Sequence, residues 1–132
     1  MHEWALAEAI ISAVSDVAER EKLREVNSVV VVIGELQQVD RNILRFAIEQ
    51  LKQGKLAGAK FIIRTERAVF TCRACGYKWP FRGTNLPEEV REIIHFIPET
   101  SHAYVRCPAC GSPDFDLSGG RGVWIASVRG EG

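Results

Sequence analysis

The sequence predicts an α+β protein with a small mixed sheet of about three strands, two helices and an inserted module. Three observations lead to this class. The chain opens with apolar residues at helical spacing, and a β-branched run follows. All four cysteines then lie in the second half, in two C-x-x-C-G turns. A length of 132 residues suits about one domain with a small satellite.

The first helix is expected from Trp4 to Glu19. Its apolar residues recur on one helical face, at Leu6, Ile10, Ala13, Val14 and Val17. The stretch Ser28–Ile33 is almost entirely β-branched, which predicts a buried strand ending at Gly34. The chain therefore starts with a helix followed by a strand.

A second helix is expected from Arg41 to about Lys52, because Asp40 can cap its first turn and Gly54 stands near its end. Two more strands are predicted at Lys60–Glu66 and Val123–Val128. The last strand returns to the sheet after the insertion.

The four cysteines form two knuckles, by which we mean the tight turns Cys72–Gly76 and Cys107–Gly111. A C-x-x-C turn places two thiolates on one ion, and four thiolates make a closed tetrahedral zinc site. The glycine after each pair suits a reversal that needs positive φ. We expect structural Zn(II) in a zinc-ribbon-like module, held by Cys72, Cys75, Cys107 and Cys110. The alternatives are two disulfides, a redox dithiol, or an iron site of the same sulfur geometry.

The segment between the two knuckles is long for a zinc ribbon. It has 31 residues between Cys75 and Cys107, whereas about 15–20 are common. The excess includes a short predicted helix, Leu86–Ile94, with Pro87 in its first turn. The expected domains are residues 1–68 with 119–132, and residues 69–118.

Composition excludes several classes of function. Lys+Arg and Asp+Glu are both 17, and this balance argues against a nucleic-acid binder. No stretch approaches the ~20 apolar residues of a membrane span, and the N-terminus lacks a basic signal-peptide region. No catalytic constellation or phosphate-binding loop is visible, so we expect a carrier and not an enzyme. Paired C-x-x-C turns without a secretion signal indicate the cytoplasm.

The N-terminus Met1-His2-Glu3 offers a second metal site. The α-amine, the His2 amide nitrogen and the His2 imidazole can close a five-membered and a six-membered chelate ring around one ion. Three nitrogens in a plane favour Ni(II) or Cu(II). Glu3 could add a carboxylate oxygen or its own amide nitrogen. The alternative is a frayed, solvated terminus.

Two further histidines lie in the inserted segment. His95 could supply a fourth in-plane nitrogen to an N-terminal chelate; otherwise it is a half-buried histidine packed by Ile94 and Phe96. His102 precedes the second knuckle, where it is either a ligand or a residue on a ribbon strand. Sequence leaves open which of the two would bind.

Taken together, these features resemble the HypA/HybF family, the nickel metallochaperones of NiFe-hydrogenase maturation. The matching features are the opening Met1-His2-Glu3-Trp4, the strand ending Ile33-Gly34-Glu35-Leu36, the two late knuckles and the terminal Gly120-Arg121-Gly122-Val123. They span essentially the whole chain. The long segment between the knuckles is similar to that of the archaeal branch.

The resemblance implies delivery of Ni(II) for hydrogenase maturation, with urease maturation also known in the family. Met1, His2 and Glu3 would hold nickel, with His2 as the main side-chain ligand, and the four cysteines would hold zinc. The implied partners are a nickel-handling GTPase and the hydrogenase large-subunit precursor. The protein would be a monomer or a dimer, because the last strand could pair with a neighbour's sheet.

A different class of function is the alternative. A zinc-ribbon module that binds nucleic acid or protein would make no use of a free N-terminus and would need a basic or aromatic stripe. The candidate basic residues are Arg73, Lys78, Arg82 and Arg106. A dithiol oxidoreductase is a second alternative, and it would need thiols that remain titratable in the metal-loaded protein.

Overall fold

The computed structural model describes residues 2–84 and 86–132, which form two compact units. The first unit comprises residues 2–33, Val39–Arg64 and Val123–Gly132. The second comprises Gly34–Gln38 and Thr65–Gly122. The assignment of nickel to one domain and zinc to the other stays a prediction.

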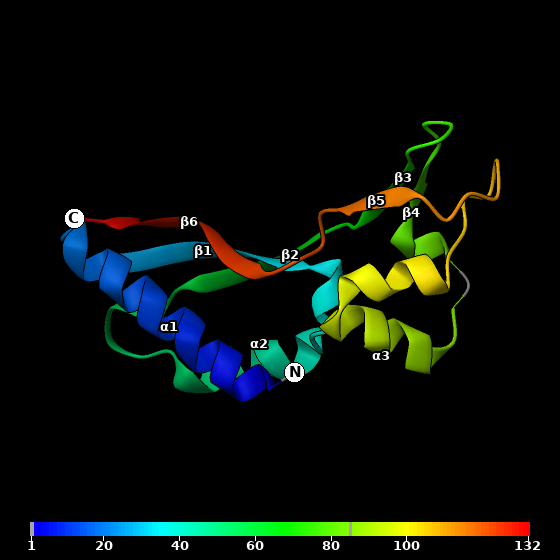
Figure 1. The fold of residues 1–132 in the computed structure, drawn as a ribbon. Helices are drawn as coiled ribbons and strands as arrows, with labels where there is room; N and C mark the ends of the chain where they lie inside the picture. Colours follow the sequence, from blue (N-terminus) through cyan, green and yellow to red (C-terminus); the bar gives the residue numbers. More distant parts are fainter. Residues whose placement is uncertain (1, 85) are drawn as a thin grey trace. The chain divides into compact units, whose positions relative to one another are not determined.

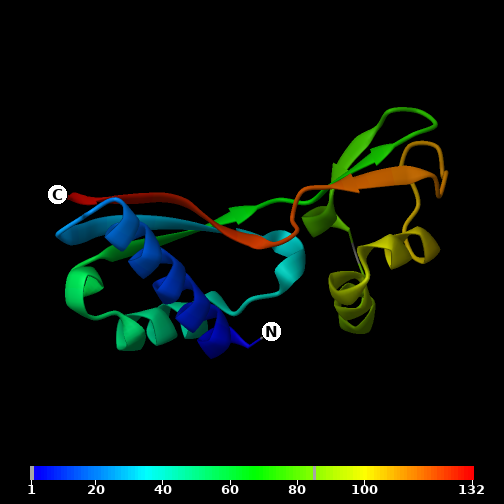
Figure 2. The same ribbon diagram turned by 60° about the vertical axis from the view of Figure 1, so that its left-hand side comes forward.

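The first unit contains a three-stranded mixed sheet in the order β2-β1-β6. Its strands are β1 (Glu25–Gly34), β2 (Lys60–Glu66) and β6 (Val123–Glu131). The last strand pairs antiparallel with β1, with Val29 opposite Val128 and Ile33 opposite Val123. Strand β2 runs in the same direction as β1 (Figure 2). The predicted sheet and the return of the last strand to it are confirmed.

Helices α1 (Glu3–Arg20) and α2 (Arg41–Leu51) cover one face of this sheet (Figure 1). The buried stripe of α1 is Ala7, Ile10, Val14 and Ala18. It differs from the predicted stripe, because Ala7 and Ala18 are buried, Leu6 and Val17 are only half-buried, and Ala13 is exposed. Strand β1 is buried on the helix side, at Val29, Val31 and Ile33, whereas Val30 and Val32 are only half-buried.

The second unit contains an antiparallel sheet in the order β4-β3-β5. Its strands are β3 (Val69–Cys72), β4 (Lys78–Pro80) and β5 (Phe115–Ser118). The unit also contains α3 (Glu88–Phe96), close to the predicted helix, and the 3-10 helix η4 (Pro98–Ala103). The sequence did not predict this sheet, because strands of three or four residues carry almost no periodic signal.

An aromatic cluster forms the core of the second unit. The Phe70 ring lies 5.0 Å from the ring centroids of both Trp79 and Phe115. Leu36, in the short 3-10 helix η1 (Glu35–Gln37), is buried in the same cluster. The segment between β1 and α2 therefore contributes to the core that supports the knuckles.

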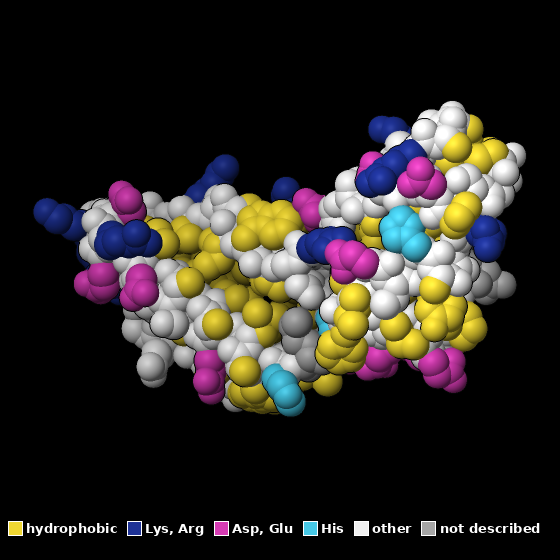
Figure 3. Space-filling model, in the orientation of Figure 1, with side chains coloured by type: hydrophobic (Ala, Val, Ile, Leu, Met, Phe, Trp, Pro, Cys, Tyr) yellow, Lys and Arg dark blue, Asp and Glu magenta, His cyan; other side chains and the backbone are white. Residues whose placement is uncertain are grey.

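The surface of the protein mixes charges of both signs. Lys and Arg side chains alternate with Asp and Glu on the face shown in Figure 3. Within the described residues, no helix is both long and apolar enough to cross a membrane.

Candidate metal centres

The four cysteines come together at one point of the second unit. All four Sγ atoms lie within 4.8 Å of one another. The Sγ atoms of Cys72 and Cys110 are 3.6 Å apart, as are those of Cys75 and Cys107. A tetrahedron with zinc–sulfur bonds of about 2.3 Å has edges of about 3.8 Å. The four thiols, which are free of disulfide bonds, thus fit a single tetrahedral metal ion.

Both knuckles have the same backbone geometry. The Gly76 N–H donates to the Cys72 carbonyl at 2.9 Å, and the Gly111 N–H donates to the Cys107 carbonyl at 2.8 Å. Each glycine has φ of 78°, a left-handed conformation that favours glycine. The sequence-based expectation for these two glycines is therefore confirmed.

The crowded sulfurs have unequal proton affinities. The Cys75 N–H, which points at the Cys72 sulfur from 3.5 Å, is the main group that lowers the pKa of Cys72 to about 7. The Tyr77 N–H favours the Cys75 thiolate, but burial and the neighbouring sulfurs outweigh it and raise the pKa of Cys75 to about 12. A bound dication would favour ionisation of all four thiols together.

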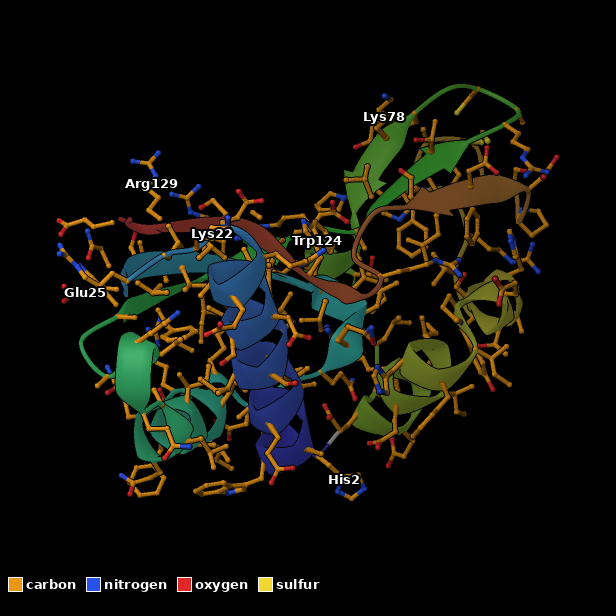
Figure 4. All side chains as sticks on the ribbon, turned by 90° about the vertical axis from the view of Figure 1, so that its left-hand side faces the viewer. His2, Lys22, Glu25, Lys78, Trp124 and Arg129 are labelled. Atoms are coloured by element: carbon orange, nitrogen blue, oxygen red, sulfur yellow. The ribbon has the colours of Figure 1, made fainter. Side chains whose placement is uncertain are left out.

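At the other end of the chain, His2 directly precedes α1. Its backbone is extended, with φ of −87° and ψ of 94°, and its carbonyl accepts from the Leu6 N–H at 3.0 Å. The imidazole is exposed and points away from the helix (Figure 4). Met1, the first predicted nickel ligand, lies outside the described residues.

Glu3 connects α1 to the start of α2. Its Oε2 accepts a hydrogen bond from the Asp40 N–H at 2.9 Å, while the Asp40 carboxylate caps α2 by accepting from the Ile43 N–H at 3.0 Å. The predicted capping role of Asp40 is confirmed. The bond from Glu3 to Asp40 was not predicted, because a contact across 37 positions leaves no local pattern.

Both candidate histidines of the second unit bind main-chain carbonyls. The Nδ1 atom of His95 hydrogen-bonds the Leu36 carbonyl, and that of His102 bonds the Pro113 carbonyl at 2.9 Å. The half-buried His95 ring lies 4.9 Å from Phe96, as expected for a packed histidine. His102 lies in η4, and its ring stacks on Phe115 at 4.3 Å.

A mixed sheet covered by two helices, together with a four-cysteine ribbon unit, defines a small metal-binding protein of the α+β class. The family model for the hydrogenase/urease nickel-incorporation metallochaperone HypA matches residues 1–130. The chain therefore belongs to the HypA family.

Relatives and a solved structure agree with this assignment. The chain is 50% identical over 132 residues to hydrogenase maturation factor HypA of Pyrococcus horikoshii, covering 98% of this chain and 95% of that protein. It is also 50% identical over 131 residues to HypA of Pyrococcus furiosus, covering 97% and 94%. The solution structure of the nickel metallochaperone HypA from Helicobacter pylori shares the fold, with a TM-score of 0.59 at 20% identity, covering 99% of this chain and 98% of that chain.

The family assignment confirms the resemblance and the predicted function, a nickel metallochaperone for hydrogenase maturation. A role in that process implies contact with the maturation machinery. The α+β fold class is confirmed as well.

Proposed function

We propose that this protein carries Ni(II) at its own N-terminus, delivers it for NiFe-hydrogenase maturation and catalyses no reaction. The observation that carries the proposal is the exposed imidazole at position 2, on extended backbone just ahead of α1, in a chain of the HypA family. In this arrangement the main-chain nitrogens beside the imidazole are available to the ion.

Met1, His2 and Glu3 are the proposed nickel ligands. The first N–H groups of a helix have no intrahelical partner, so the His2 and Glu3 amides keep no helical hydrogen bond that nickel would break. The Glu3 carboxylate already accepts from the Asp40 N–H, so the amide nitrogen is the less costly donor of Glu3, and it is the donor that His95 replaces when His95 completes the planar set of four nitrogens. Because amide nitrogens must lose a proton to bind, nickel affinity should rise with pH.

His95 is the proposed fourth ligand, with His102 as the less favoured candidate. The His95 ring is half-buried, and its Nδ1 atom bonds the Leu36 carbonyl, which leaves Nε2 for a metal ion. His102 is less suited because one face of its ring is covered by Phe115.

In the second unit, the proposed role of Cys72, Cys75, Cys107 and Cys110 is to hold Zn(II). Their sulfur geometry supports one tetrahedral ion. Structural zinc supplies about 10–16 kcal/mol of apparent binding free energy, which is realised as folding of its unit. Zinc would thus be permanent, whereas nickel at a terminal chelate can be given up to a partner.

The proposed partners are a nickel-handling GTPase and the hydrogenase large-subunit precursor. We place the protein in the cytoplasm, because four closely spaced free thiols suit a reducing compartment. We expect it to be a monomer or a dimer. These assignments rest on the family and on cysteine chemistry.

The test is a nickel titration of zinc-loaded protein with its native Met1 amine. Binding is monitored by calorimetry and by the absorption bands of planar Ni(II). The matched protein carries two extra residues ahead of Met1, and His2→Ala removes the imidazole. The native form should bind about one Ni(II), and both changes should weaken binding by at least about tenfold. Equal binding by the native and extended forms would place nickel elsewhere and contradict the proposal.

A further inference from the structure

The His95 imidazole is held by a main-chain group 59 positions away, the carbonyl oxygen of Leu36. A carbonyl oxygen can only accept a hydrogen bond, so Nδ1 of His95 must carry the hydrogen. In the neutral ring, Nε2 then keeps its lone pair. The contact with Leu36 therefore selects which nitrogen of His95 can bind a metal.

The Leu36 carbonyl is itself fixed from several sides within the second unit. The Leu36 N–H donates to the Gly120 carbonyl at 2.8 Å, and the Gly34 N–H donates to the Gly122 carbonyl at the same distance. The preceding Glu35 carboxylate accepts from the Ala68 N–H at 2.9 Å. These bonds anchor the segment Gly34–Leu36, which leads directly to the carbonyl.

The Leu36 side chain adds an apolar anchor. It is 3% exposed and belongs to the same buried cluster as Ile94, the residue immediately before His95. A carbonyl held in this way keeps a constant direction and so orients the ring it binds. Metal-binding histidines commonly donate their second N–H to such an acceptor, which fixes both the tautomer and the ring plane.

We propose that Leu36 is a positioning residue of the nickel site: its carbonyl holds His95 as the Nδ1–H tautomer and presents Nε2 to Ni(II). This inference rests on the proposed function, in which His95 supplies the fourth nitrogen. It adds that the η1 segment, and not α3 alone, prepares His95 before nickel arrives.

The first test measures the tautomer directly, by long-range ¹⁵N–¹H NMR of full-length, zinc-loaded, nickel-free protein at a pH where imidazole is neutral. His95 should show a protonated Nδ1 and an unprotonated Nε2. The exposed His2 is the internal comparison and should show the Nε2–H preference of free histidine. An Nε2–H tautomer at His95 would overturn the proposal.

One equivalent of Ni(II) is then added. Planar four-nitrogen Ni(II) is diamagnetic, so the spectrum remains readable, and the His95 Nε2 resonance should move far more than its Nδ1 resonance. A nickel-loaded spectrum in which His95 Nε2 is unmoved would overturn its presentation to nickel.

Two leucine variants separate positioning from general packing. Leu36→Ala removes the apolar side chain that anchors η1. Leu117→Ala removes a side chain of β5 that packs against the same apolar cluster. Leu36→Ala should move His95 toward the Nε2–H tautomer and weaken nickel binding about 10-fold to 100-fold at unchanged zinc content. Leu117→Ala should change neither property. Equal effects of the two variants, or an unchanged tautomer in Leu36→Ala, would contradict the proposal.

Substitutions of His95 itself complete the test. Asn places an N–H donor near the Nδ1 position but offers no atom at Nε2. His95→Asn should therefore keep the melting temperature of the second unit close to that of the original protein, while His95→Ala lowers it, and both should weaken nickel binding. If Asn and Ala destabilise equally, the bond to Leu36 has no positioning role. The tautomer is measured on nickel-free protein, whereas the N-terminal chelate is tested by nickel titration of the protein with two extra residues ahead of Met1. A wrong prediction about the tautomer can therefore be told apart from a wrong prediction about the chelate.

Discussion

Single residues of this protein act through main-chain atoms as much as through side chains. The Cys75 N–H lies against the Cys72 sulfur, and the Leu36 carbonyl holds the His95 ring. At the N-terminus, the proposed chelate uses the His2 amide nitrogen. Substitutions that alter only a side chain will therefore understate the role of these positions, and tests at this scale need reporters of backbone geometry or of metal proximity.

Trp4 is such a reporter. It follows the proposed nickel ligands directly, is 45% exposed, and meets the Phe46 ring edge-on at 6.1 Å. Nickel bound at residues 1–3 should quench Trp4 fluorescence, because quenching by Ni(II) acts over short distances. A titration of Trp4→Phe should lose most of the nickel-dependent decrease, whereas Trp124→Phe should retain it. An unchanged decrease in Trp4→Phe would place the ion away from the terminus.

Position 34 requires a glycine, because the main chain at Gly120 and Arg121 lies very close to it. A Cβ at this position would lie 2.2 Å from the Gly120 carbonyl oxygen and 2.6 Å from the Arg121 nitrogen, and main-chain atoms cannot easily move aside. We expect Gly34→Ala to lower the free energy of unfolding by about 1–3 kcal/mol or more, measured by thermal melting.

The matched control for Gly34 is Gly58→Ala. Among the described residues, the one atom within 4 Å of a Cβ there is Glu25 Oε1, at 4.0 Å. That variant should be neutral or stabilise by up to about 1 kcal/mol, through reduced freedom of the unfolded chain. Equal stability of the two variants would mean that the backbones near Gly34 are not closely packed.

At the scale of elements, we expect the second unit to depend on its cysteines more than on its strands. Strands β3, β4 and β5 have only three or four residues each. Arg73, in the first knuckle, also binds two aspartates that follow the second knuckle. Its Nε atom lies 3.1 Å from an Asp116 oxygen, and its Nη1 atom lies 3.4 Å from an Asp114 oxygen. These ion pairs are exposed and contribute little, so we expect the proposed metal ion to stabilise this unit together with its small aromatic core.

Removal of the metal by a chelator should therefore unfold the second unit selectively. Amide hydrogen exchange should show lost protection at β3, β4 and β5, while α1, α2 and β1 stay protected by their own apolar core. Adding zinc back under reducing conditions should restore protection. Uniform loss across both units would contradict a division into a metal-dependent and a metal-independent part.

At the scale of the whole molecule, charge balance bears on the choice between carrier and nucleic-acid module. The net charge is zero. Of the candidate basic residues on the ribbon, Arg73 is paired with Asp114 and Asp116. Elsewhere, Arg121 pairs with Glu99 at 3.3 Å and Lys55 with Glu19 at 2.9 Å. Because Arg73 is shared with two carboxylates and the chain has no basic excess, the ribbon is a poor candidate for a phosphate-binding surface.

We therefore expect zinc-loaded protein to retain neither RNA nor DNA in a filter-binding assay at modest salt. Binding to phosphates releases counterions, so a true nucleic-acid module would show retention that falls steeply as salt rises. That result would favour the zinc-ribbon alternative over the carrier. The nickel titration of the same preparation provides the positive control for folded protein.

Features that depend on neighbouring residues along the chain could be predicted from the amino-acid sequence. Helical periodicity predicted α1 and α2, and runs of β-branched and apolar residues predicted β1, β2 and β6, because these signals lie in neighbouring residues. The C-x-x-C-G spacing predicted both knuckles and their positive-φ glycines, and Asp40 was predicted as a cap. The N-terminal chelate is also local chemistry, because its proposed ligands are consecutive residues.

Other contacts between distant groups depend on how the chain folds. The bond from Glu3 to Asp40 joins residues 37 positions apart and was not predicted, unlike the meeting of the four cysteines. The His95 bond to Leu36 spans 59 positions and uses a carbonyl that every residue possesses. Sequence cannot single out such an acceptor, since its position is set by the packing of Leu36 and not by its residue type. The tautomer of His95 is therefore a property of the fold.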